Sequence, residues 1–162
     1  MNRVVFSICF TLLSLPLAAR ANDDIKQKLV GVWRLESFFI ESVETKEKRS
    51  VYGEKPNGYL IITPDRLMTV ITGQGRKAAQ TDDERAALLR TMFAYTGNYR
   101  VDGDRLTTKV DVSWNEAWVG TDQTRIARFE GDKLILQSLP APAANQQMPG
   151  MVTGILMWAK SK

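Results

Sequence analysis

Few side chains in this sequence could do chemistry. It contains no His, and its single Cys, Cys9, lies in the apolar N-terminal run. A Ser-His-Asp triad, a Cys nucleophile, a haem-ligating His and an ordinary structural zinc site are therefore excluded. Tyr, Lys, Arg and the carboxylates remain, and the carboxylates are not clustered at the offsets that a hard cation requires. We expect no metal and no cofactor, and the sequence assigns no catalytic residue.

The remaining Tyr, Lys, Arg and carboxylate side chains lie in a chain whose sequence pattern is mainly that of strands. Apolar and polar residues alternate from Ala94 to Ser138, interrupted by turns at Asp102-Gly103 and Glu130-Gly131-Asp132. This pattern predicts four strands joined by turns, with consecutive strands pairing antiparallel and no helix between them. Such a meander hides its edges most simply by closing, and a barrel of about eight strands can enclose one small ligand.

Alternation also assigns an inner face to each of these strands. We expect the lumen to be lined by Tyr95, Tyr99, Val110, Val112, Trp114, Arg125, Ala127 and Phe129. All of these except Ala127 are our candidate ligand-binding residues. The alternative is that the same side chains simply fill a closed core. A register slip of one residue would reverse a whole strand, and the apolar run in residues 59–72 does not show which side faces inward.

The rest of the chain supplies four more strands and one helix. We expect strands at 29–42, where Leu35, Ser37 and Phe39 share the face of Trp33, and at 59–63, 67–72 and 151–160. A capping box at Thr81 to Glu84 predicts a helix over residues 81–93. This helix either packs on the barrel wall or over one end, or acts as a lid that places Met92 and Phe93 in the pocket. The fold class is therefore all-β: an eight-stranded antiparallel up-and-down barrel with one short α-helix between strands 3 and 4, in which the last strand pairs with the first.

The N-terminus predicts export. Residues 1–21 combine a basic start, an apolar run and an A-x-A arrangement ending at Ala21, which is typical of a secretory signal peptide. The mature domain would span residues 22–162 and be periplasmic in a Gram-negative host, otherwise secreted. Removing Arg3 and Arg20 lowers the net charge from +4 to +2. We expect neither nucleic acid nor stable membrane insertion among its interactions, and the sequence leaves the oligomeric state open.

Several motifs resemble a known family. Gly31-Val32-Trp33 opens the first strand, and further matches lie in residues 52–65, 118–125 and 131–134. Together they are similar to the bacterial and fungal lipocalin-like domain family. The resemblance implies a calycin-type barrel and small-molecule binding, and it brings no general catalytic signature. The chain departs from the family in having no histidines in the strand at residues 107–112.

Arg125 is the most specific candidate. Alternation places it inside the barrel with Phe129, where its guanidinium must stack on an aromatic ring, pair with a carboxylate or meet an anionic ligand. In lipocalins an Arg on a late strand packs across the Trp of the Gly-x-Trp motif, so the resemblance favours a structural Trp33–Arg125 contact over ligand recognition. Arg128 is expected to point outward.

Two functions remain open. In the first, the chain is an exported, non-catalytic lipocalin-like barrel whose lumen binds a small, largely apolar or aromatic molecule. In the second, it is a barrel isomerase or cyclase that acts on a small hydrophobic substrate with Tyr and carboxylate acid–base groups. A carboxylate in the lumen near Tyr95 or Tyr99 would favour the second.

Overall fold

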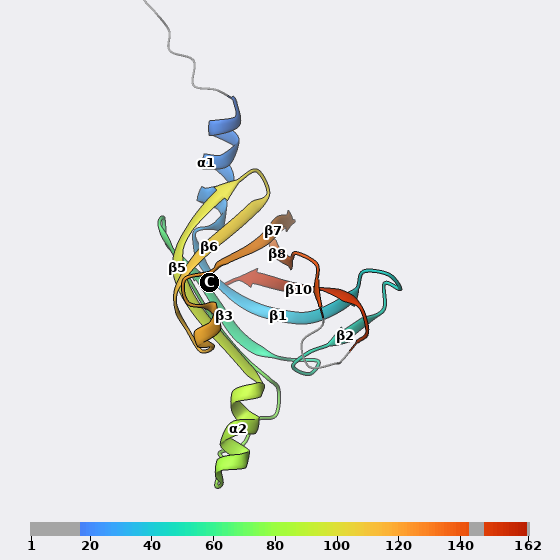
Figure 1. Cartoon of the computed structure of the whole chain (residues 1–162). Coiled ribbons are helices and arrows are strands. Elements are labelled where there is room, and N and C mark those ends of the chain that lie inside the picture. The colour runs from blue at the N-terminus through green and yellow to red at the C-terminus, as the bar shows by residue number, and fades with distance from the viewer. Residues whose placement is uncertain (1–16, 143–147, 162) are drawn as a thin grey trace, which may run out of the picture.

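The computed structural model describes residues 17–142 and 148–161, and its strands form one closed sheet (Figure 1). The eight long strands are β1 (Gly31–Ser42), β3 (Asn57–Ile62), β4 (Arg66–Thr72), β5 (Met92–Asp102), β6 (Arg105–Ser113), β7 (Asp122–Glu130), β8 (Lys133–Ser138) and β10 (Met151–Lys160). Neighbouring strands pair antiparallel, and β10 closes the barrel by pairing with β1. Two short strands, β2 (Lys48–Ser50) and β9 (Ala141–Pro142), pair with β1 and β10. The predicted eight-stranded barrel is confirmed.

One end of the barrel is closed by α1 (Leu17–Leu29) and the first residues of β1. Leu29 is fully buried, and the Trp33 indole donates a hydrogen bond to its carbonyl oxygen at 2.8 Å. Trp33 also lies opposite Lys160 in the β1–β10 register. The predicted meeting of Trp33 with the last strand is therefore confirmed.

The helix between the third and fourth long strands is α2 (Asp82–Arg90). Thr81 and Glu84 form the predicted capping box, in which each side chain accepts a hydrogen bond from the other residue's backbone N–H. The helix has no buried residue and projects away from the barrel (Figure 1). The expected packing on the barrel wall or across one end is therefore wrong. Met92 and Phe93 belong to β5 rather than to the helix.

The structure shows which residues of the β3–β4 hairpin face inward, which the sequence pattern of residues 59–72 does not indicate. Leu60 and Ile62 on β3 are buried, as are Leu67 and Ile71 on β4. Tyr59, by contrast, is 44% exposed. The inner set therefore consists of the even positions on β3 and the odd positions on β4.

Two β-bulges change the faces predicted by strict alternation. In β1 the register shifts between Leu35 and Ser37, after which Phe38, rather than Phe39, lies on the inner side and joins the barrel core. In the β5–β6 pair, Thr96 lies opposite Val112 and Gly97 opposite Val110. An extra residue in one strand reverses the faces beyond it.

Val112 shows the consequence of the second bulge. Its side chain is 62% exposed on the outer wall, whereas Val110 is 1% exposed. The expected place of Val112 in the lumen is therefore wrong, because the bulge lies between these two valines.

The predicted signal peptide falls largely outside the described residues, which begin at Leu17. The structure shows α1 running through the expected cleavage point at Ala21. Within the described part of the chain, no helix has the length and apolar character needed to cross a membrane.

Candidate ligand-binding cavity

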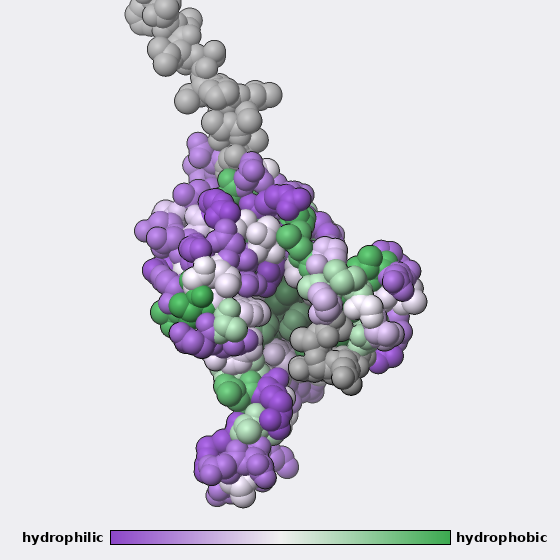
Figure 2. All heavy atoms as spheres, viewed as in Figure 1, coloured by the Kyte–Doolittle hydropathy of each residue, from purple (hydrophilic) through white to green (hydrophobic). Residues whose placement is uncertain are grey.

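The barrel encloses a cavity of about 1160 Å³ that reaches the end from which α2 projects. Its deeper wall is formed by inward side chains of β3, β8 and β10: Leu60, Leu136, Leu156 and Trp158. Figure 2 looks into this hollow and shows that its visible walls are largely hydrophobic. The alternation of each strand thus builds an apolar interior that the side chains do not fill.

Aromatic side chains surround one side of the cavity. Phe93 and Tyr95 come from β5, Trp114 lies just beyond the end of β6, and Trp118 ends the short 3₁₀ helix η1 (Glu116–Trp118). The ring centroids of Trp114 and Trp118 are 5.0 Å apart in an edge-on arrangement, and those of Tyr95 and Trp118 are 5.6 Å apart. Such spacings are those of attractive aromatic pairs.

Two further rings extend this group. Phe38 from β1 lies 5.9 Å from Phe93 and 5.6 Å from Tyr52, measured between centroids. Both Phe38 and Tyr52 line the cavity. We call these six residues, Phe38, Tyr52, Phe93, Tyr95, Trp114 and Trp118, the aromatic cluster. They give the cavity flat, polarisable surfaces suited to a planar apolar group.

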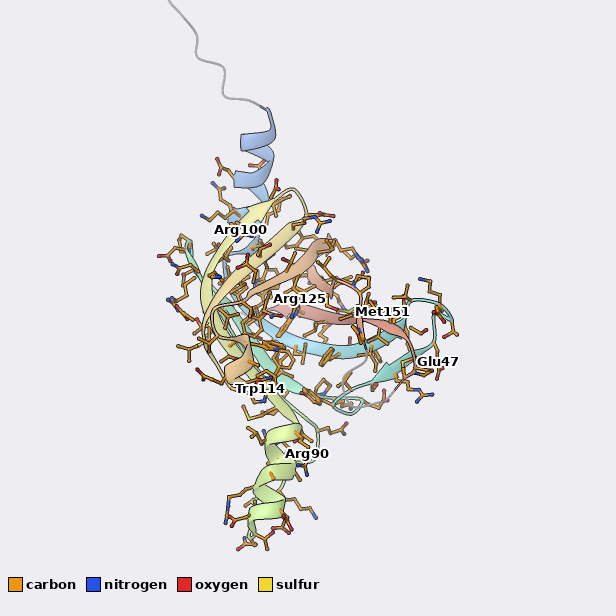
Figure 3. All side chains as sticks on the ribbon, in the orientation of Figure 1. Glu47, Arg90, Arg100, Trp114, Arg125 and Met151 are labelled. Atoms are coloured by element: carbon orange, nitrogen blue, oxygen red, sulfur yellow. The ribbon has the colours of Figure 1, made fainter. Side chains whose placement is uncertain are left out.

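Arg125 lies on the cavity wall, on β7 opposite Ser138 of β8. Its guanidinium donates hydrogen bonds to the Thr124 carbonyl at 2.8 Å and to the Gln123 side-chain oxygen at 3.4 Å. Within the described residues it forms no ion pair with a carboxylate. Figure 3 shows Arg125 in the barrel interior and Trp114 toward the end of the barrel from which α2 projects.

The expected packing of Arg125 across Trp33 is wrong. The cation over the Trp33 ring is the ammonium of Lys160, 5.2 Å from the centroid, and Phe129 lies 6.2 Å from the same ring. Arg125 is four residues before Phe129 on β7, about 13 Å away along an extended strand. Lys160 of the last strand therefore supplies the cation at the closed end, and Arg125 lies at the cavity instead.

Three of the predicted ligand-binding residues meet at the cavity: Tyr95, Trp114 and Arg125. Tyr99, Val110 and Phe129 instead belong to the packed core below it. The Tyr99 hydroxyl donates to the Thr63 carbonyl at 2.8 Å near the closed end. These three residues share the correct face but lie too far along their strands to reach the cavity.

Sequence reasoning missed other members of the site. Strict alternation groups Phe39, and not Phe38, with Trp33, because the bulge in β1 has no clear local signal. Tyr52 lies in an irregular connection, where alternation assigns no face. Trp158 could have been found, since the alternation of residues 151–160 already groups it with three other cavity residues: Val152, Gly154 and Leu156.

The polar groups of the cavity wall include hydrogen-bond donors without acceptors. Trp158 is 1% exposed, and its indole N–H has no partner among the described residues. The Tyr95 hydroxyl likewise has no hydrogen bond within this part of the chain. Burial raises the pKa of the Tyr52 hydroxyl, and the nearby charge of Arg76 partly opposes that rise. Tyr52 therefore stays neutral beyond the ordinary range of a tyrosine.

The carboxylates of the cavity lie at its edge. Asp122 is bound by Arg100 at 2.9 Å, and this hydrogen bond is the main cause of its lowered pKa. Glu116 is exposed on η1. Neither forms a hydrogen bond with Tyr95 in the described structure, and no group of three potential metal ligands occurs there.

Comparison with known proteins agrees with this architecture. The family model described as a lipocalin-like domain matches residues 30–161, which covers all eight long strands. No curated protein matches the chain. The family match extends over most of the sequence and accords with the closed antiparallel barrel. The chain therefore belongs to the lipocalin-like domain family.

Proposed function

We propose that this chain is an exported, non-catalytic barrel that binds a small, largely apolar or aromatic molecule in its lumen. The observation that carries the proposal is the cavity of about 1160 Å³ bordered by the aromatic cluster. Ligand sites in proteins usually occupy about 300–1,000 Å³ and combine apolar walls with a few polar groups. A cavity slightly larger than this range supports binding over a completely filled core.

The proposal of export rests on the N-terminal sequence and on the position of the contacts of α1. Ile25 and Leu29 pack against the core, and the Lys26 ammonium lies 5.6 Å from the Tyr99 ring centroid. All three residues follow Ala21. Cleavage there would leave the described closed-end contacts on the mature chain.

A titration with the neutral fluorophore phenylnaphthylamine tests the proposed binding. Three of the four Trp residues, Trp114, Trp118 and Trp158, line the cavity. A bound fluorophore should therefore quench tryptophan emission as its own emission rises. Both signals should saturate at one molecule per barrel. Absence of saturable binding by this probe would contradict the proposed function.

Two variants locate the binding site. Trp118→Ala removes a ring from the aromatic cluster and should weaken phenylnaphthylamine binding by about tenfold, on the order of one buried aromatic contact. Val112→Ala is the matched control, because Val112 lies outside the barrel on the neighbouring part of the wall. The affinity should be read from the probe's emission, since Trp118→Ala also removes a protein fluorophore. Equal effects of the two substitutions would place the probe outside the lumen.

A further inference from the structure

The charge of Arg125 has no anionic partner in the described cavity wall. Its hydrogen bonds to the Thr124 carbonyl and the Gln123 amide oxygen are made to neutral groups. A guanidinium cannot be deprotonated in a protein, so its charge persists at any pH at which the fold exists. A partly buried cation of this kind is stabilised most effectively by an anion with matching oxygen atoms.

The carboxylates that line the same cavity, Asp122 and Glu116, are already paired or exposed to solvent. Asp122 forms ion pairs with Arg100 at 2.9 Å and with Lys109 at 3.8 Å. Glu116 lies in η1 at the edge of the cavity and is exposed to solvent. Neither carboxylate is within 4 Å of the Arg125 guanidinium, so the cavity keeps the unneutralised charge.

Trp158 provides an independent observation. It lines the same cavity from β10, is 1% exposed, and leaves its indole N–H without an acceptor in the described residues. A buried donor without an acceptor is uncommon in native proteins, and either an ordered water or an atom of a bound ligand can supply the acceptor. An indole N–H can only donate, so the missing group must carry a lone pair. The Tyr95 hydroxyl, also without a partner, adds a donor on β5.

We infer that the ligand is an amphipathic organic acid with a carboxylate or similar anionic group at Arg125 and a flat apolar body against the aromatic cluster. This inference rests on the proposed function and specifies its ligand class. The two hydrogen bonds of Arg125 orient the guanidinium and leave other N–H donors for a two-pronged contact with the anion. A further oxygen of the ligand accepts from Trp158.

A pair of fluorophores with the same apolar body tests the charge. Phenylnaphthylamine is neutral, and anilinonaphthalene sulfonate adds one anionic group to the same ring system. The wild-type barrel should bind the sulfonate more tightly, by about tenfold or more, as expected for a charge-assisted contact in an apolar site. Arg125→Gln should abolish this preference, because it should weaken binding of the sulfonate far more than binding of the neutral probe.

Arg128→Gln is the matched control. Arg128 lies on the same strand, points outward, and contacts Gln137 at 3.1 Å and Glu130 at 3.5 Å. Its loss should leave both affinities unchanged, although the net charge falls by the same amount as in Arg125→Gln. An equal loss of sulfonate binding in the two variants would show a general surface-charge effect and overturn the inference.

The remaining outcomes separate this inference from the proposed function. If both probes bind the wild type equally, or Arg125→Gln weakens both equally, the acidic ligand class is wrong and lumen binding stands. If neither probe binds, the proposed function fails as well. If circular dichroism shows that Arg125→Gln is unfolded, Arg125→Lys is the second variant, because it retains the charge. It should retain part of the preference for the sulfonate over the neutral probe. A folded Arg125→Lys protein without that preference would refute the inference.

Trp158→Phe tests the second contact. The substitution keeps an aromatic ring in the core but removes the indole N–H. It should weaken binding of the sulfonate severalfold and binding of the neutral probe by much less. Unchanged sulfonate binding would overturn the assigned role of Trp158 in holding the ligand.

Discussion

Replacing Gly97 by Ala tests the close approach of β5 and β6 at their bulge. A Cβ atom at Gly97 would lie 1.9 Å from the Lys109 carbonyl oxygen and 2.7 Å from its carbonyl carbon. Backbone atoms cannot rotate away as a side chain can, so the strands must separate. Overpacking costs about 1–3 kcal/mol, and each weakened ladder hydrogen bond adds about 0.5–1.5 kcal/mol. We therefore expect Gly97→Ala to lower the free energy of unfolding by about 2–4 kcal/mol.

Urea denaturation followed by tryptophan emission measures this loss. With a denaturant dependence of about 2 kcal/mol per M, the midpoint should fall by about 1–2 M. Gly154→Ala is the control, because its new Cβ would meet the Phe38 ring edge at 3.3 Å, a contact that a small ring movement relieves. Separation of β5 from β6 in Gly97→Ala should also displace Tyr95 and Trp114. The folded variant should therefore bind phenylnaphthylamine more weakly than the wild type. Equal midpoint shifts for the two variants would refute the described approach of the strands.

Three other predictions follow from individual side chains. Val110→Ala should lower the free energy of unfolding by about 1–3 kcal/mol, because Val110 is 1% exposed. Val112→Ala should change the free energy of unfolding by less than about 0.5 kcal/mol, because Val112 lies on the outer wall. Urea midpoints of both variants measure this difference, and equal losses would contradict the bulge between the two valines. Burial raises the pKa of Tyr52, so its contribution to stability is complete below the ordinary tyrosine pKa of 10.0 and is lost as pH rises through the raised value. Burial raises the pKa of Tyr99 as well, so ultraviolet difference titration should show a late phase from both residues, which Tyr52→Phe should reduce. An unchanged titration curve in Tyr52→Phe would be inconsistent with the raised pKa of Tyr52. The Glu84 carboxylate accepts backbone hydrogen bonds from Gln80 and Thr81 that lower its pKa. Glu84→Ala removes this acceptor and should speed amide exchange in α2 while the barrel's exchange stays unchanged. Unaltered exchange in α2 would count against the capping role.

The architecture was predictable because its determinants are local. Alternation over residues 94–138 and its turns specify consecutive antiparallel strands, and these strands are β5 to β8 of the structure. The same reasoning predicted that the last strand would return to Trp33, since an open edge would leave backbone groups unpaired. Strand existence and order follow from patterns that extend over only a few residues.

The set of side chains that line the cavity depends on strand register, which is a property of two paired strands and not of one. The close contact of Gly97 with Lys109 accompanies a bulge that moves Val112 outside, and the bulge in β1 brings Phe38 in. Neither shift changes the alternation of the sequence itself. Trp114 reaches the cavity because β6 ends at Ser113, beyond which strand alternation does not apply.

For Arg125, too, the sequence determines one property and the tertiary structure another. Sequence alternation by itself determined that this cation faces inward, because β7 pairs with β8 in a register that no bulge interrupts. Only the tertiary structure decided what it meets there. Lys160, far away in sequence, covers Trp33 through the β1–β10 closure, and Asp122 is held by Arg100 on β5. A side chain's direction is set by its own strand, but its partners are set by the elements that closure brings against it.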